Sequence, residues 1–168
     1  MRLKLIQSFL IIALLIGVLA GCAPSIEEVS AETKTLVGQS FAETPIEGNK
    51  NHESFSYHLP EGMVIESKGE NNVILQKEEQ LYILFVNSNE EKDSDVMYQS
   101  INMETSSEII NETFVDDNRF GYVRVAELED VFEVSVGIGG AKMTTECKLK
   151  DVTENAEQMM DIVASISY

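Results

Sequence analysis

The stretch VFEVSVGIGGAKMTTECKLK, residues 131–150, decides the fold class. Its first half places apolar side chains at alternate positions, and its second half continues the alternation from Met143 to Leu149. A period of two is typical of β-strands with one buried face. Gly139 and Gly140 separate the two runs, and paired glycines permit the backbone of a tight hairpin turn. The stretch therefore predicts two antiparallel strands, over 131–138 and 142–150.

The same kind of pattern continues on the N-terminal side of this hairpin. Residues 119–128 form another strand-like run that ends at the turn residues Glu129 and Asp130, which predicts a three-stranded meander. The run LYILFV, residues 81–86, is apolar at every position and predicts a central strand buried on both faces. Turn and capping residues bound the remaining elements. Further strands are predicted over 55–59, 63–67, 73–76 and 108–115, and helices over 96–103 and 153–166, the last capped by Thr153, with Ala156, Met159, Met160, Val163 and Ile166 on its inner side.

This order of strands, helix, strands and helix predicts an α+β fold, a single domain with a mainly antiparallel sheet and packed helices. The phrase FSYHLPEG, residues 55–62, opens the domain, and with the order of elements it resembles the Mog1/PsbP-like fold. That fold also occurs in small secreted and lipid-anchored bacterial proteins. The resemblance covers residues 53–168 and implies diverse, largely non-catalytic functions. It transfers no functional residue, because the chain matches no functional motif of the family.

The N-terminus has the three parts of a secretory signal peptide. Arg2 and Lys4 precede an apolar run over 9–20, and small residues follow directly. The segment Leu-Ala-Gly-Cys at 19–22 resembles the lipobox of bacterial lipoproteins. The resemblance implies that residues 1–21 are removed and that Cys22 carries a diacylglycerol thioether. An uncleaved membrane anchor is the alternative, but polar residues interrupt the run before it reaches the roughly 20 apolar residues that a spanning helix needs.

The remaining chain divides into two predicted parts. Residues 22–50 are rich in Ser, Thr, Glu and Gly, which predicts a lipidated N-terminus and flexible tether, with a short helix over 25–35 as an option. Residues 51–168 form the predicted globular domain. Removing residues 1–21 leaves 10 Lys and Arg against 29 Asp and Glu, a formal charge of −19. The chain has no cluster of Lys and Arg, so nucleic acid is excluded as a partner.

Few side chains could form a catalytic or metal centre. Cys147 is the one cysteine left beside Cys22, and it shares a strand face with Met143 and Leu149, which predicts a small core residue. The two histidines, His52 and His58, have no cysteine partner and no H-E-x-x-H motif, so zinc is not expected. No G-x-S-x-G nucleophile elbow is present, and no cofactor is predicted.

Two further stretches resemble ligand-binding loops. GIGGAK, residues 137–142, has the wrong spacing for a phosphate loop and is predicted to be a hairpin turn. DDNRFGYVRVAE, residues 116–127, places Phe120 where a calcium loop needs an oxygen ligand, so an EF-hand is not predicted. A looser cation site at Asp116 and Asp117, or in the acidic loop over 90–95, stays open. Acidic pairs such as Glu78–Glu79 and Glu90–Glu91 are predicted to be solvated charge.

These observations predict a lipid-anchored, extracytoplasmic bacterial lipoprotein at the surface of the cell membrane. We expect a non-enzymatic accessory or binding protein whose partners are the membrane, through the anchor, and an envelope protein or small ligand. Exposed apolar residues on a sheet face that helices leave uncovered would mark the partner site. A small envelope hydrolase is one alternative, and the solute-binding component of a transporter is another.

Overall fold

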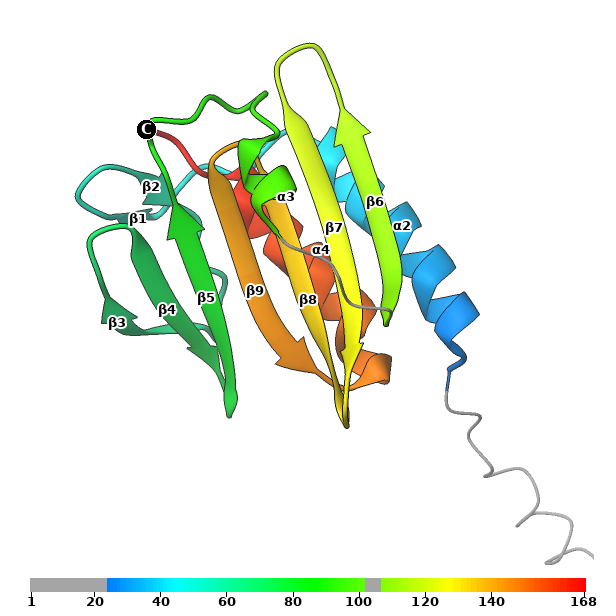
Figure 1. Cartoon of the computed structure of the whole chain (residues 1–168). Coiled ribbons are helices and arrows are strands. Elements are labelled where there is room, and N and C mark those ends of the chain that lie inside the picture. Colours follow the sequence, from blue (N-terminus) through cyan, green and yellow to red (C-terminus); the bar gives the residue numbers. More distant parts are fainter. Residues whose placement is uncertain (1–23, 102–106) are drawn as a thin grey trace, which may run out of the picture.

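The computed structural model describes residues 24–101 and 107–168. They form a single domain around a seven-stranded antiparallel sheet with the strand order β3-β4-β5-β9-β8-β7-β6 (Figure 1). A two-stranded sheet, β1-β2, lies beside it. The predicted α+β class with a mainly antiparallel sheet is confirmed. The strands are β1 (Lys50–Asn51), β2 (Ser56–Tyr57), β3 (Val64–Lys68), β4 (Asn72–Lys77), β5 (Gln80–Val86), β6 (Glu108–Val115), β7 (Phe120–Leu128), β8 (Val131–Ile138) and β9 (Ala141–Cys147).

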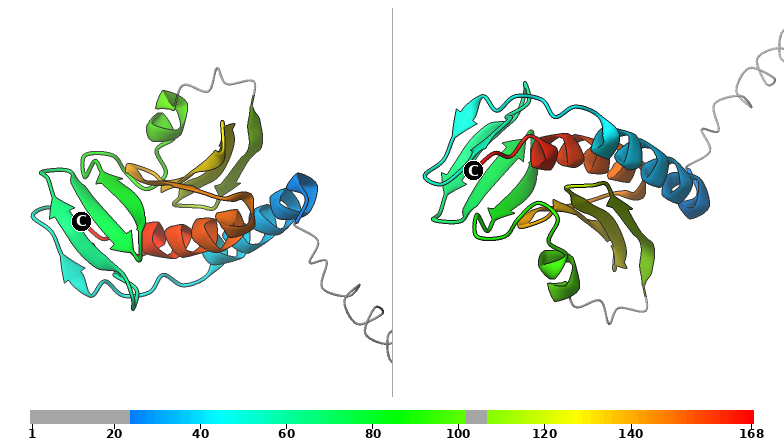
Figure 2. Two further views of the ribbon diagram at one scale, coloured as in Figure 1. Left: turned by 90° about the horizontal axis from the view of Figure 1, so that it is seen from below. Right: turned by 90° about the horizontal axis from the view of Figure 1, so that it is seen from above.

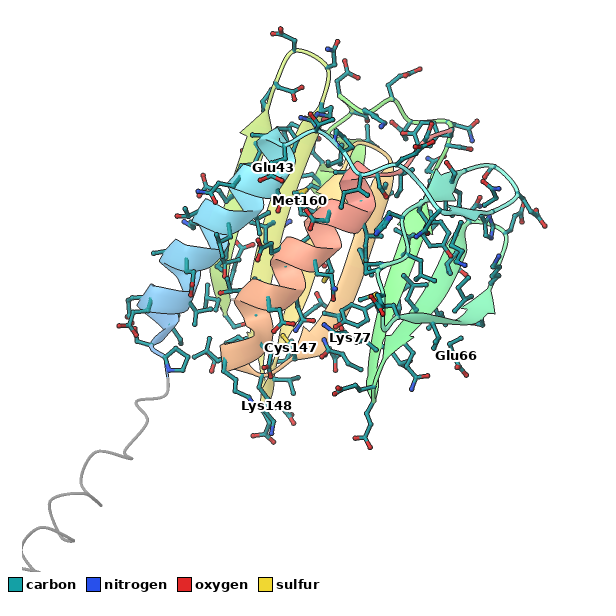
Figure 3. All side chains as sticks on the ribbon, turned by 180° about the vertical axis from the view of Figure 1, so that it is seen from behind. Glu43, Glu66, Lys77, Cys147, Lys148 and Met160 are labelled. Carbon is teal, nitrogen blue, oxygen red and sulfur yellow. The ribbon has the colours of Figure 1, made fainter. Side chains whose placement is uncertain are left out.

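Helices cover the two faces of the seven-stranded sheet unequally. Helices α2 (Ile26–Ala42) and α4 (Val152–Ala164) lie side by side on one face, which we call the covered face (Figures 2 and 3). The short helix α3 (Val96–Ser100) lies on the other, which we call the open face (Figure 2). A 3₁₀ turn, η2 (Leu149–Asp151), leads into α4. Within the described ranges, every helix is too short or too polar to cross a membrane.

The meander predicted from the opening stretch is confirmed, except that the strand predicted over 142–150 ends at Cys147 and Leu149 belongs to η2. Strands β7, β8 and β9 are neighbours in the sheet, and the register pairs Val134 with Val125 on one side and with Thr145 on the other. Gly139 has φ +54° in the turn between β8 and β9, a conformation that glycine adopts without strain. The predicted inner residues of the last helix are all buried in the core. Apolar alternation was sufficient to find this half of the sheet.

The flexible tether predicted over 22–50 is wrong for residues 26–42, where the optional short helix over 25–35 is part of a longer helix. Helix α2 begins with a capping box, in which the Ser25 side chain accepts from the backbone N–H of Glu28 while the Glu28 carboxylate accepts from that of Ser25. The helix buries an apolar face against the sheet and α4. On this face lie Val29, Val37 and Phe41, which are spaced by eight and four residues and are each at most 5% exposed. The core therefore begins within the predicted tether, and only residues 23–25 separate Cys22 from the helix.

The prediction that 81–86 is buried on both faces is also wrong. In β5, Tyr82, Leu84 and Val86 are almost fully buried on the covered face, whereas Leu81 and Ile83 are half-exposed on the open face. The strand is central in the sheet, between β4 and β9. No described element packs over its open side, because α3 lies over β7 and its neighbours instead (Figure 1).

Several element boundaries differ from the sequence-based predictions. The strand expected over 55–59 is only β2, which pairs with β1 outside the main sheet. Asp151, not Thr153, occupies the N-cap position of the last helix, and its side chain makes no capping hydrogen bond, while the Thr153 hydroxyl lies 2.9 Å from that of Thr33 on α2. Helix α3 ends at Ser100, and the final residues of the helix predicted over 96–103 lie outside the described residues.

Both edges of the seven-stranded sheet are irregular. On β3, the pairing with β4 shifts register between Ile65 and Ser67, which is the sign of a bulge. On β6, the pairing with β7 shifts between Glu108 and Ile110. The inner strand pairs have continuous registers.

Candidate interaction surface

Half of the open face is covered by α3. The Tyr98 ring of this helix lies 5.5 Å from the Phe120 ring and 5.3 Å from the Tyr122 ring, both on β7. The Arg124 guanidinium lies 5.3 Å from the Tyr98 ring and donates to the Glu108 carboxylate and to the Ile101 carbonyl. Tyr122 and Arg124 are therefore buried, so this half offers little surface to a partner.

The other half of the open face is bare and apolar. Strand register places Ile74 of β4 directly opposite Ile83 of β5, and Gln76 of β4 opposite Leu81. Val64 of β3 lies opposite Gln76 and so belongs to the same face. Phe85 is two residues beyond Ile83 and faces the same way. We call this group the open-face patch: Val64, Ile74, Leu81, Ile83 and Phe85.

The open-face patch is exposed to an unusual degree for side chains of this size. Val64 is 56% exposed, Leu81 50% and Ile83 51%, while Ile74 and Phe85 are partly buried. Scattered apolar residues are ordinary on a protein surface, but neighbouring ones on a rigid sheet indicate an interaction site. The patch matches the predicted form of a partner site, which is a group of exposed apolar residues on a sheet face that helices leave uncovered. The sequence instead predicts that LYILFV, which supplies three of these residues, is buried on both faces.

Charged residues border the open-face patch on β8 and β9. Lys142 lies opposite Phe85 at one end. At the other end, Glu146 of β9 lies directly opposite Glu133 of β8. Tyr82 pairs with Thr145, and continuing that register places Leu81 beside Glu146. Apolar and acidic side chains thus adjoin on one surface.

Cys147 is a core residue, as predicted. It is 7% exposed, and burial raises the pKa of its thiol to about 11, with the nearby Asp151 carboxylate adding to the shift. A thiol of this kind stays protonated at neutral pH and is a poor nucleophile. The cysteine lies at the end of the sheet where α4 begins (Figure 3).

The two histidines do not form a shared site. The His52 ring stacks on the Phe55 ring at a centroid distance of 4.6 Å. His58 follows β2, and its Nδ1 lies 3.4 Å from the Glu47 carbonyl oxygen. Across the two described ranges, no group of three or more His, Cys, Asp or Glu side chains is arranged to hold a metal ion.

The acidic stretch at 116–118 is a hairpin turn between β6 and β7. Asp116 accepts from Arg119 Nε at 2.8 Å and from Nη2 at 2.6 Å, and these bonds hold the pKa of its carboxyl below the usual range. A shallow hollow of about 500 Å³ adjoins the turn and includes Lys92 and Asp117. Because Arg119 already neutralises Asp116, the geometry offers little to a cation.

The remaining sequence candidates lie apart from one another. GIGGAK forms the end of β8, the turn and the start of β9, as predicted. Glu78 and Glu79 form the turn between β4 and β5, and Glu90–Glu91 lie in the loop before α3. A second shallow hollow, of about 540 Å³, lies between the β1–β2 turn and Lys68. Cys22, the predicted lipidation site, lies outside the described residues.

Comparison with known proteins gives no family for this chain: no protein-family model matches it, and neither does any curated protein.

Proposed function

We propose that this protein is a bacterial lipoprotein, anchored through lipid on Cys22 at the extracytoplasmic face of the cell membrane, and that it acts as a non-enzymatic accessory protein. Its domain binds another envelope protein through the open-face patch. The proposed likeness of the domain to the largely non-catalytic Mog1/PsbP-like fold agrees with a binding role. No specific observation favours the hydrolase or the transporter component.

The observation that carries the binding role is the exposure of Leu81 and Ile83. Both belong to a central strand of an antiparallel sheet, where the face that helices leave uncovered usually carries polar side chains, whereas these two are apolar. Their neighbours Tyr82 and Leu84 are buried in the core on the covered face, so the strand itself is firmly held. A rigid sheet presents the exposed pair at little cost in conformational entropy, which favours binding over a flexible surface.

The anchoring role is supported by the N-terminal sequence. A charged start, an apolar run and a Leu-Ala-Gly-Cys segment stand in the order that lipoprotein processing requires. One acyl chain binds membranes only marginally, whereas two or more give stable attachment. Attachment confines the domain near the membrane and raises its effective concentration for envelope proteins there.

Anchoring is tested by fractionating cells that express the full chain. We expect the protein in the membrane fraction, with a diacylglyceryl thioether on Cys22 in the mass spectrum of the mature N-terminal peptide. A Cys22→Ser variant should lose this modification and the processing that depends on it. An unmodified thiol on Cys22 in the mature wild-type protein would refute the anchor.

The binding role is tested by photo-crosslinking in intact cells. A benzoylphenylalanine at position 83 should crosslink to one envelope protein, and the crosslink should disappear when Leu81→Ser is added. Positions 46 and 115 are matched controls, because Ile46 is 49% exposed and Val115 is 70% exposed outside the patch. Equal crosslinking from all three positions, or none from position 83, would contradict a docking role for the open-face patch.

A further inference from the structure

Two features on the open face work against the stability of the free domain. The first is the exposed open-face patch, which leaves apolar surface in water. The second is the pair Glu133 and Glu146, which lie directly opposite each other on β8 and β9. Like charges in directly opposite positions destabilise a sheet. Features that cost stability in this way tend to mark functional sites.

The carboxylates of Glu133 and Glu146 have no cation beside them within the described residues. Neither forms an ion pair within 4.0 Å with any described Lys, Arg or His. Lys148 is the next residue but one after Glu146, yet it is not among the ion pairs of the described ranges. By contrast, Glu108 on the neighbouring β6 is bonded to Arg124 at 2.9 Å. Among the described residues, no cationic side chain therefore offsets the negative charge of Glu133 and Glu146 in the way that Arg124 offsets the charge of Glu108.

The charge of the whole chain limits which kinds of molecule could bind at the open-face patch and the Glu133–Glu146 pair. The chain beyond residue 21 has a formal charge of −19 by its Lys, Arg, Asp and Glu content, so a second copy would be repelled. Anionic lipid headgroups would be repelled for the same reason. A divalent ion would find only two carboxylates here, and no described group of three or more acidic or histidine side chains could hold one. A cationic protein segment is attracted by the charge and can also cover the patch.

Resting on the proposed binding role, we propose that the partner docks a segment in which Lys or Arg side chains adjoin apolar ones. A basic side chain of that segment binds between Glu133 and Glu146. The apolar side chains beside it cover Leu81 and Ile83, which adjoin Glu146 across the β5–β9 pair. Charge selects the partner and fixes its position, and burial of the open-face patch adds a comparable share of the affinity.

The test measures binding of the chain from residue 23, which contains the whole described domain, to a synthetic peptide. The probe is a nine-residue peptide of alternating Lys and Val, with blocked ends and a fluorescent label. We expect Glu133→Gln/Glu146→Gln to weaken binding about tenfold, because charge-assisted contacts are lost. Leu81→Ser/Ile83→Ser should weaken it by a similar factor. A peptide with Glu in place of Lys should not bind.

A matched variant separates a local effect from the general field of an acidic protein. Glu27→Gln/Glu32→Gln removes the same two charges from exposed positions on α2, on the other side of the sheet. It should weaken peptide binding less than threefold. Equal losses in the two double variants would overturn the proposal, since they would show that only net charge matters.

Thermal unfolding provides a second readout. Without peptide, Glu133→Gln/Glu146→Gln should melt about 1–3 °C higher than the wild type, because the like-charge pair is removed. If the melting temperature falls instead, the pair stabilises the fold and the proposal is wrong. If calcium chloride stabilises the wild type but not this variant, the occupant of the Glu133–Glu146 pair is a metal ion and the proposal is likewise overturned.

The two proposals can fail separately. Loss of the position 83 crosslink in cells, together with normal peptide binding, would refute the docking role in the cell but not the chemistry of the surface. A position 83 crosslink that Glu133→Gln/Glu146→Gln leaves unchanged, with no binding of the Lys–Val peptide, would refute the cationic segment and leave the docking role standing.

Discussion

The two faces of the seven-stranded sheet follow different rules. On the covered face, Leu75, Leu84 and Val134 are fully buried in the hydrophobic core, and apolar side chains dominate. On the open face, apolar, hydroxyl and charged side chains alternate from strand to strand, and only one half carries a helix. Most of the buried apolar core lies on the first face, while the half of the second face that α3 leaves bare has few packing constraints. A docking surface can therefore evolve on the second without endangering the fold.

The comparison is sharpest along a single strand. Tyr82 and Leu84 of β5 point to the covered face, and Leu81 and Ile83 point away from it. All four residues lie on the same strand. Differences in stability between their variants therefore reflect which face of the sheet each side chain occupies. The predictions below use this and similar contrasts.

The largest effect is expected where α2 meets the covered face. Phe41→Ala should lower the free energy of unfolding by about 3–5 kcal/mol. The Phe41 ring stacks on Phe114 at 5.7 Å, lies beneath the Arg119 guanidinium and packs against Gly121, where any larger residue would clash. Urea unfolding measures the change, with Ile46→Ala as a control expected to stay within about 0.5 kcal/mol. A loss below 1 kcal/mol for Phe41→Ala would mean that α2 is a tether after all.

Leu84→Ala and Ile83→Ala separate the two faces directly. Leu84 is fully buried, so its truncation should cost about 2–4 kcal/mol. Ile83 is 51% exposed, so its truncation should cost less than about 1 kcal/mol. Both are measured by urea unfolding under the same conditions. Similar losses for the two variants would contradict the assignment of a bare half to the open face.

A smaller effect is expected for the polar contact between the covered face and α4. The Tyr82 hydroxyl donates to the Asn155 side-chain oxygen, and Gln80 donates to the same oxygen at 3.1 Å. Tyr82→Phe should cost about 1 kcal/mol, since Asn155 keeps one donor. Burial raises the pKa of Tyr82 to about 12, with Cys147 adding to it, so its phenol should be absent from the spectrophotometric tyrosine titration below pH 11. Titration of every tyrosine near pH 10 would contradict this environment.

The smallest effect concerns the carboxylates on α4. Burial raises the pKa of Asp161 and of Glu157, and the Glu43 carboxylate near both adds to the shift. A raised folded pKa means that these groups contribute stability fully below their unfolded pKa and lose it as pH rises through the folded value. Asp161→Asn should therefore raise the melting temperature at pH 7 and have no such benefit at pH 3.5. A gain of the same size at both pH values would refute this cause.

The sequence predicted the covered face better than the open one. Alternation in 131–150 and the spacing of Ala156, Met159 and Met160 reveal which side chains are buried together, because one buried face imposes a period. The run LYILFV has no such period, so the sequence wrongly predicted that both of its faces are buried. Packing requires apolar side chains on the covered face, and the proposed binding role would require them on the open face, so the sequence alone does not distinguish the two faces.

Only a short helix over 25–35 was offered as an option for this region, and the full length and burial of α2 were missed because its apolar positions are sparse and mixed with threonine and serine. Thr33, fully buried, meets Thr153 across the helix pair, and Ser40 is 8% exposed. Serine and threonine are typical of flexible tethers in a sequence. Thr33 and Ser40 are buried only because α2 packs against α4 and the sheet. The pairing of Glu133 with Glu146 was equally hidden, because register between two strands depends on the turn between them.

The shifted registers at both edges of the sheet affect how easily copies of this chain aggregate when they are crowded together. An open sheet edge is a template on which another copy of the chain can add its own strand. Bulges at Ile65–Ser67 and Glu108–Ile110 twist these edges. Exposed Glu66 (Figure 3) and Lys68 add charge on β3, where a new strand would pair. The protein can thus present an apolar surface for recognition while its two edges resist aggregation.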